Sequence, residues 1–219
     1  EAMKPNTFDP TATTTGNNQF VGVCPEPQEN KPIYVYSPYD ASNDSKTGDI
    51  VVSVPTEQRL TSGALVADSA PFIQVNAQTF RTTRAIRCDM KMVSALAQFN
   101  VYSKKQVNDK LSKIVLRGTN IAGSHTYNIY SKDDVGPLNP TGMITATADK
   151  AITITTDKYN PATTYMGVWE GTHTMTAEIY AGAYYYVVPL PEAVFEKGKV
   201  TLYEICLDEY EKFLAPDVE

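Results

Sequence analysis

The residues with the greatest potential for chemistry are two histidines, three cysteines and a few acidic loops. His125 lies in a Ser-His-Thr run and His173 in a Thr-His-Thr run, and neither has Glu, Asp or Cys at the spacing of a metal ligand. The chain also lacks the GxSxG, SxxK and HExxH motifs of hydrolases and the glycine-rich loops that bind phosphate. We therefore expect both histidines on the surface or on edge strands, and a protein with no catalytic residue, no metal and no cofactor.

The cysteines and the main acidic loop give no stronger signal. Cys24, Cys88 and Cys206 are too widely spaced for a zinc knuckle or a redox CxxC pair, and an odd number allows at most one disulfide within the chain. We expect all three to be small buried residues, and whether two of them form a disulfide is left open. The loop from Asp40 to Asp49 carries enough oxygen ligands for Ca²⁺, but its spacing differs from that of an EF-hand, so we interpret it as a turn.

Aromatic side chains are the remaining candidates for ligand binding, because an exposed ring offers an apolar face on which a sugar can stack. Trp169 is the single tryptophan, and Tyr184, Tyr185 and Tyr186 are consecutive. Side chains alternate between the two faces of a strand, so at least one of these tyrosines must pack in a core. Trp169 and Tyr185 are therefore candidate glycan-stacking residues, with core and edge packing as the alternative.

Composition favours strands and turns over helices. The 219 residues include 14 Tyr and 14 Pro, and 42% are hydrophobic and 20% charged, which is the balance of a folded domain. The net charge is −6 and basic residues do not cluster, which excludes nucleic acid as a partner, while the apolar runs are too short for a transmembrane helix. The chain begins at Glu1, and we interpret it as a processed or trimmed fragment without its targeting segment.

Short β-rich runs separated by turn residues follow one another along most of the chain. Strands are predicted at residues 19–24, 32–37, 49–54, 71–77, 86–92, 97–103, 112–117, 125–130, 151–156, 164–169, 174–180, 183–188 and 199–206. Apolar and polar residues alternate in several of these runs, so one face of each strand packs on a core and the other meets water. This pattern predicts an all-β fold, an antiparallel β-sandwich.

The two ends of the chain differ from the rest. Residues 1–18 are polar without apolar periodicity and are expected to form a tail or linker, followed by a β-sandwich domain over residues 19–206. Residues 207–219 are expected to form a C-terminal tail or a short helix, because the apolar residues between 207 and 214 have helical spacing.

The order of the segments resembles the fimbrillin family of bacterial pilus and adhesion proteins, over roughly residues 19–206. The matching segments are Tyr34–Tyr39 (YVYSPY), the pair Glu57-Gln58, Leu65–Ala70 (LVADSA), Cys88–Val101, Leu111–Gly118 (LSKIVLRG), Tyr185–Pro191 (YYVVPLP) and Gly198–Tyr203. The resemblance implies a transthyretin-like sandwich, exported as a lipoprotein and displayed on the cell surface, either associated with the outer membrane or extracellular.

The same resemblance implies a structural or adhesive subunit of a pilus, or fimbrium. Such subunits assemble by strand donation, in which a peptide from one copy completes the sheet of the next after proteolysis frees the acceptor groove. Either residues 1–18 or the segment after Leu207 is a candidate donor. The implied partners are other fimbrial subunits, host or bacterial surface proteins, and glycans.

Two further expectations accompany this interpretation. Asp68-Ser69-Ala70 resembles the short acceptor sequence for O-glycosylation of exported proteins in such bacteria, which makes Ser69 a candidate modification site. The alternative function is a surface-exposed carbohydrate-binding module without catalysis, which would use Trp169 or exposed tyrosines.

Overall fold

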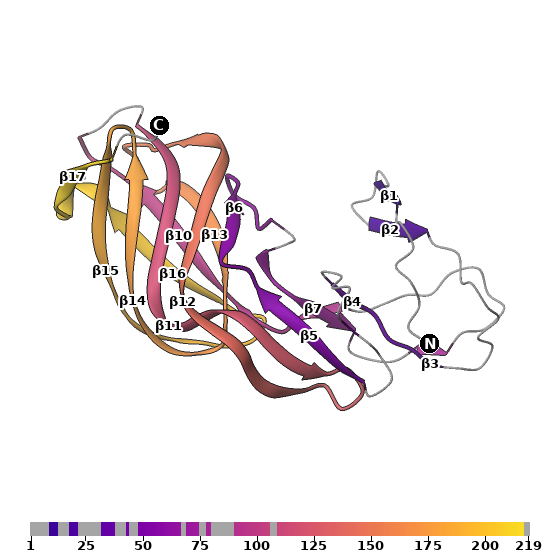
Figure 1. Ribbon diagram of the computed structural model, residues 1–219. Helices are drawn as coiled ribbons and strands as arrows, with labels where there is room; N and C mark the ends of the chain where they lie inside the picture. The colour runs from indigo at the N-terminus through magenta and orange to yellow at the C-terminus, as the bar shows by residue number, and fades with distance from the viewer. Residues whose placement is uncertain are drawn as a thin grey trace.

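A computed structural model describes residues 9–12, 18–21, 32–37, 43, 48–66, 69–74, 78–79, 90–105 and 109–216 (Figure 1). The strands of the N-terminal half are β1 (Asp9–Ala12), β2 (Asn18–Val21), β3 (Pro32–Ile33), β4 (Tyr36–Ser37), β5 (Asp49–Val54), β6 (Glu57–Leu60), β7 (Phe72–Gln74), β8 (Gln78–Thr79), β9 (Met90–Met92) and β10 (Ala95–Tyr102). They are followed by β11 (Lys110–Asn128), β12 (Asp133–Thr153), β13 (Ala162–Val168), β14 (Gly171–Ala181), β15 (Tyr184–Phe195), β16 (Val200–Cys206), the 3₁₀ turn η2 (Leu207–Glu209) and β17 (Lys212–Leu214).

Two sheets form the body of the molecule. The larger has the strand order β17-β15-β14-β11-β12-β6, with β5 also paired to β11, and the smaller has the order β13-β10-β16. The hairpin of β11 and β12 is long, at 19 and 21 residues, and its distal part projects from the body together with β5 (Figure 1). Three short two- or three-stranded ladders (β1-β2, β3-β8 and β4-β7-β9) complete the described strands.

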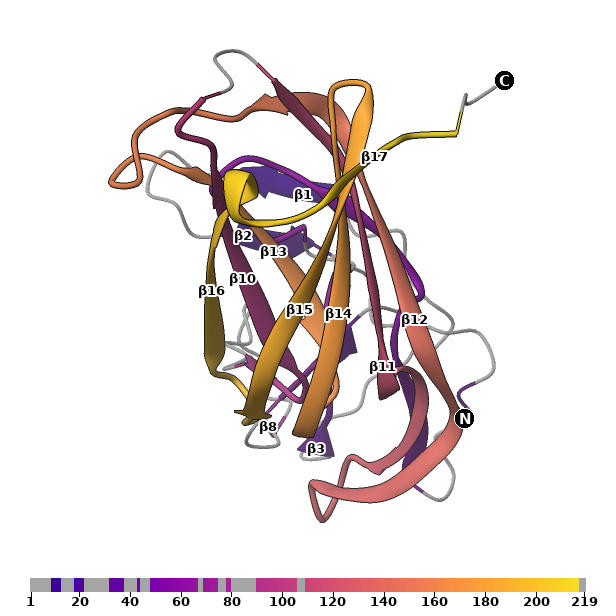
Figure 2. The same ribbon diagram turned by 90° about the vertical axis from the view of Figure 1, so that its left-hand side faces the viewer.

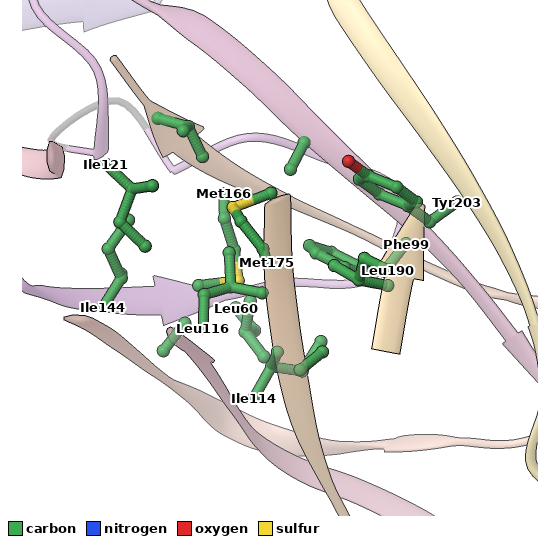
Figure 3. Packing of buried hydrophobic residues seen from close by; sticks show 14 of the residues in the cluster. Leu60, Phe99, Ile114, Leu116, Ile121, Ile144, Met166, Met175, Leu190 and Tyr203 are labelled. Atoms are coloured by element: carbon green, nitrogen blue, oxygen red, sulfur yellow. The ribbon is translucent and has the colours of Figure 1, made fainter. Parts of the chain in front are cut away.

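The core lies between the two sheets. Along β10 the residues at positions 95, 97, 99 and 101 are buried, and along β14 the residues at 173, 175, 177, 179 and 181 are buried, so each strand turns one face inward. Figure 3 shows side chains from both sheets meeting in one layer. The labelled members of that layer are Leu60, Phe99, Ile114, Leu116, Ile121, Ile144, Met166, Met175, Leu190 and Tyr203, all at most 5% exposed.

The predicted all-β sandwich is confirmed, and the structure changes it in detail. Two pairs of strands, β6–β12 and β10–β16, are parallel, whereas the prediction was antiparallel. The separate strands predicted at 112–117 and 125–130 are one strand, because register shifts in the β11–β12 ladder absorb the Gly-Thr-Asn turn signal between them. The domain limits and the transthyretin-like topology stay predictions.

The ends of the chain also depart from expectation. Residues 9–12, in the predicted tail, pair with residues 18–21. Where a C-terminal tail or a short helix was expected after residue 206, the structure has one 3₁₀ turn, after which the chain extends into β17. Among the described residues no helix is both long and apolar enough to cross a membrane.

Gln58 joins the two sheets along one side of the sandwich. From β6 its Nε2 donates to the Gly167 carbonyl oxygen of β13 at 2.9 Å and to the Pro55 carbonyl oxygen at 3.0 Å, while the Gly167 N–H donates to its Oε1 at 2.9 Å. The Gly63 N–H also donates to the Thr163 carbonyl oxygen of β13, at 2.8 Å. A side-chain amide thus takes the place of a neighbouring strand and satisfies an edge that would otherwise carry unpaired groups.

Asn43 closes the edge of β5 in the same way. Its Nδ2 donates to the Val51 carbonyl oxygen at 3.0 Å, and the Val51 N–H donates to its Oδ1 at 2.6 Å. On the opposite side of the sandwich from Gln58, the edges belong to β16 and to β15, and β15 is partly covered by β17 (Figure 2).

Candidate functional site

Trp169 is a core residue, so its prediction as a glycan-stacking residue is wrong. The side chain is 1% exposed, its ring stacks on His125 with centroids 3.8 Å apart, and its Nε1 donates to the Gly123 carbonyl oxygen at 2.9 Å. A buried ring with both its face and its N–H engaged offers no surface to a sugar.

Both histidines are also buried, at 9% exposure for His125 and 7% for His173, which contradicts the surface position expected from their polar neighbours. His125 Nδ1 lies 3.0 Å from Asp134 Oδ2, and His173 Nε2 lies 3.0 Å from the Trp169 carbonyl oxygen. Asp134 is on β12, across the ladder from β11, so the sequence spacing did not reveal the pair.

The surroundings of this pair are those of a structural cluster. Lys197 Nζ lies 2.8 Å from Glu170 Oε1 and 3.9 Å from Asp134 Oδ2. Burial raises the pKa of Tyr127, and the negative charge of Asp134 raises it further, while its hydroxyl donates to the Lys132 carbonyl oxygen. In the described part of the chain no group of three His, Cys, Asp or Glu side chains is placed to hold a metal ion. The cluster therefore ties the long hairpin to the turns of the body.

Ser69 is 1% exposed, so the predicted O-glycosylation site is not accessible in the folded protein. The backbone of Ser69 lies directly against β13. A Cβ added to Gly167 of that strand would lie only 1.8 Å from the Ser69 carbonyl oxygen. A glycan on this hydroxyl would have to displace the segment that covers the small sheet.

The remaining predicted residues fall partly outside the described ranges. Cys206 is a buried free cysteine, as expected of a small apolar residue, and its Sγ lies 3.7 Å from Asp208 Oδ2. Cys24 and Cys88 lie outside the described residues, as does most of the acidic loop. Asp49, at the end of that loop, accepts a hydrogen bond from Asn128 Nδ2 at 2.7 Å.

Tyr185 belongs to a row of side chains that crosses the outer face of the large sheet. In the strand register Lys113 of β11 is opposite Tyr180 of β14, Tyr180 is opposite Tyr185 of β15, and Tyr185 is opposite Phe213 of β17. Lys113 Nζ lies 3.8 Å from the Tyr180 ring centroid, and the stacked rings of Tyr180, Tyr185 and Phe213 follow at 5.3 Å spacing. We call these four residues the aromatic row.

The aromatic row leaves little of Tyr185 for a ligand. Because β14 and β17 flank β15 on opposite sides, Tyr180 and Phe213 cover the two faces of the Tyr185 ring. The Tyr185 side chain is only half-buried, but its stacking faces are occupied as long as β17 stays in place. Its prediction as a glycan platform therefore depends on whether β17 can leave.

β17 is only weakly attached to the large sheet. It pairs with β15 over three residues only, Tyr184 to Tyr186, and the Ala215 N–H donates to the Ala183 carbonyl oxygen at 3.0 Å. All three of its side chains are exposed, with Phe213 at 42% and Leu214 at 73%. Lys212 Nζ lies 4.4 Å from the Tyr184 ring centroid. A strand with no buried side chain contributes little apolar burial and belongs to the low-stability part of a fold.

The chain just before β17 is anchored more firmly. Asp208 Oδ2 accepts hydrogen bonds from the Lys104 N–H at 2.5 Å and the Ser103 hydroxyl at 3.2 Å. Partial burial by itself would raise the pKa of Asp208, but these hydrogen bonds and that from the Cys206 thiol lower the pKa below its ordinary value. The ionised carboxylate thus fixes the end of η2, and the chain is weakly held only beyond it.

Pro189 limits how far a strand can pair along the edge of β15. The Ala183 carbonyl oxygen faces β17, and backbone groups alternate in direction, so residues 185, 187 and 189 also face outward. Pro189 has no N–H to donate at that position, and proline is a residue that protects sheet edges. The open edge therefore accepts a short strand near Tyr185 and resists a long one.

Sequence reasoning missed Tyr180, Phe213 and Lys113 as members of a site. Tyr180 and Tyr185 flank the two-residue turn Gly182-Ala183 symmetrically, and this symmetry is a usable signal, because residues equidistant from a hairpin turn face each other. Phe213 had no comparable signal, since its segment has helical spacing and its pairing depends on a distant strand.

Comparison with known proteins gives a likeness of fold. A structure from Bacteroides uniformis, described as a "putative cell adhesion protein", matches with a TM-score of 0.56 and 13% sequence identity, covering 97% of this chain and 84% of that one. A second, from Bacteroides ovatus and described in the same words, gives a TM-score of 0.48 and 16% identity over 92% of this chain and 74% of that one. No protein-family model and no curated protein sequence matches the chain. At 13% identity the likeness to the Bacteroides uniformis structure establishes the fold alone, and membership of the fimbrillin family stays a prediction.

Proposed function

We propose that this protein is a structural or adhesive subunit displayed on a cell surface, and that it joins neighbouring copies by exchanging β17. The observation that carries the proposal is the three-residue ladder between β17 and β15, with its exposed side chains. The fold that the chain shares with a putative cell adhesion protein is consistent with this role.

The physical argument concerns what β17 leaves behind. Its departure would expose unpaired backbone groups on Ala183 and Tyr185 and one face of the Tyr185 ring. A β17 from a second copy would restore the same hydrogen bonds and the same stacking, so exchange costs association entropy but no net loss of contacts. Strand addition of this kind satisfies main-chain groups and fills side-chain positions together. Of the two candidate donors, the segment after Leu207 is the one this geometry supports.

The finer features belong to the same proposal. They are assembly into a pilus, or fimbrium, export as a lipoprotein, and a location at the outer membrane or outside the cell, with other subunits or surface proteins as partners. We propose no catalytic role, because the His125–Asp134 pair is committed to packing against Trp169 and to holding the long hairpin.

Sedimentation velocity over a series of protein concentrations tests the proposal. The native chain should form oligomers as concentration rises. Phe213→Asp should raise the midpoint concentration by about tenfold or more, because the lost stacking on Tyr185 and the added carboxylate release β17 from the edge of its own subunit as well. Docking too weak to keep β17 on its own subunit cannot offset the larger entropy cost of joining two copies. Leu138→Asp is the matched control, because Leu138 is similarly exposed (52%) but lies on β12 away from this edge. A chain that stays monomeric throughout, or oligomers that Phe213→Asp leaves unchanged, would refute it.

A further inference from the structure

A hollow of about 650 Å³ lies at the end of the sandwich where β6, β12 and β13 come together. Its floor includes Leu60, Ile152 and Ala162, which are buried, and exposed polar residues such as Ser62, Lys150 and Asn160 stand around it. The lining therefore combines a small apolar floor with a rim of hydrogen-bonding groups. None of the residues of the aromatic row lines this hollow.

The loop between β12 and β13 forms part of the hollow and carries an unusually exposed ring. Thr155 and Asn160 of this loop line the hollow, and Tyr159, which precedes Asn160, is 89% exposed. Tyrosine at that exposure contributes nothing to the core, and this one stands on the loop whose residues Thr155 and Asn160 line the hollow. An exposed aromatic ring on a loop that borders a concave surface is a candidate for ligand contact.

Hydrogen bonds hold this loop in one conformation. The Thr155 hydroxyl contacts the carbonyl oxygens of Asp157 at 3.1 Å and Asn160 at 2.6 Å, and the Tyr159 N–H donates to Asp157 Oδ1 at 2.8 Å. The Asn160 N–H donates to the Asp157 carbonyl oxygen at 3.1 Å. A ring presented on a fixed backbone loses less conformational entropy when a ligand binds.

We propose that the hollow and Tyr159 form a binding site for a neutral oligosaccharide. A sugar has apolar C–H faces that stack on an aromatic ring and hydroxyls that hydrogen-bond to Ser, Asn and Lys side chains, which is the combination found here. Asp149 and Lys150 line the hollow, and Asp157 and Lys158 lie on the same loop as Tyr159, so both signs of charge are present and a strongly charged ligand is not favoured. The site goes beyond the proposed assembly and does not depend on it.

A glycan array with neutral, sialylated and sulfated oligosaccharides tests the site, using the whole chain. Neutral glycans should bind, Tyr159→Ala should weaken that binding by about tenfold or more, and Tyr159→Phe should retain it, because the ring and not the hydroxyl makes the contact. Ser62→Trp should abolish binding by filling the hollow.

Phe213→Ala is the matched aromatic control and should leave glycan binding unchanged while it weakens assembly. Thermal unfolding of each variant verifies that the fold is intact. Absence of binding to any neutral glycan overturns the proposal, as does binding that survives Tyr159→Ala or Ser62→Trp. Because assembly responds to Phe213 and glycan binding to Tyr159, failure of one proposal is distinguishable from failure of the other.

Discussion

Replacing Trp169 with alanine is expected to lower the free energy of unfolding by about 3–5 kcal/mol, the range for removing a buried large aromatic side chain. The ring is 1% exposed and stacks on His125, and its Nε1 is hydrogen-bonded to the Gly123 carbonyl oxygen. The variant would lose this packing, leave a cavity, and deprive that carbonyl oxygen of its donor. Urea unfolding monitored by far-UV circular dichroism measures the change, because this signal reports on the backbone and does not require the tryptophan.

The control for this variant is Tyr159→Ala, which removes an aromatic ring that is 89% exposed. Its free energy of unfolding should stay within about 0.5 kcal/mol of the native value. If Trp169→Ala were equally harmless, or if it abolished glycan binding without loss of stability, Trp169 would be a ligand-contacting residue and the description of it as core would be wrong.

Gln58→Ala is the second substitution with a large expected effect. The variant would leave the N–H and carbonyl groups of Gly167 without their partner, and each unsatisfied buried group costs about 1–3 kcal/mol. We therefore expect a loss of about 2–5 kcal/mol in the free energy of unfolding, measured by urea denaturation. Hydrogen exchange at the Gly167 amide should accelerate as the edge of β13 opens.

Glu57→Ala is the matched control for Gln58, since Glu57 is the exposed neighbour on the same strand. It should change stability by less than about 0.5 kcal/mol. Gln58→Glu should keep one of the two hydrogen bonds with Gly167, whereas the native chain makes both and Gln58→Ala makes neither. A carboxylate accepts from the Gly167 N–H but cannot donate to its carbonyl oxygen. Equal stability of Gln58→Ala and the native chain would mean that another contact closes this side of the sandwich.

Because the side of the sandwich at Gln58 has no free strand edge among the described residues, the proposed exchange takes place on the opposite side. Strand edges on that side are satisfied by side-chain amides, and along β15 Pro189 limits pairing. On the opposite side, the described strands leave the edge of β16 and the short stretch of β15 that is covered by β17. A subunit that exchanges only β17 can receive one donor and give one donor, which is what a linear array requires.

The all-β fold could be predicted from the sequence because period-two alternation is a local property. Residues 97–101 and 174–180 alternate in the sequence, and both lie in strands with one buried face. Long-range pairing was not predictable in the same way. The Gly-Thr-Asn signal near Asn120 predicts a turn, yet the ladder to β12 continues past it with a positive φ of 53° at Asn120.

The candidate sites depend still more on contacts distant in sequence. His125 meets Asp134 only because β11 and β12 pair, and Tyr185 meets Phe213 only because the C-terminal segment returns to β15. Helical spacing near Phe213 favoured a helix, but edge pairing with β15 outweighs that local preference. The exposure of Tyr159 is easier to predict than these long-range contacts, because Tyr159 lies in a polar Lys-Tyr-Asn-Pro turn with no apolar alternation.

Disulfide trapping between two differently substituted chains is the most direct test of strand exchange. One chain carries Tyr184→Cys and the other Leu214→Cys, in a background where the native cysteines are serine; these positions are directly opposite in the β15–β17 ladder. They form a non-hydrogen-bonded pair, whose Cα atoms are about 4.5 Å apart and within disulfide reach. Oxidation of the mixture should give a covalent heterodimer by mass spectrometry, whereas Val194→Cys with Leu214→Cys should not. Exclusive recovery of single chains, or equal yields from the two mixtures, would contradict exchange of β17 between copies.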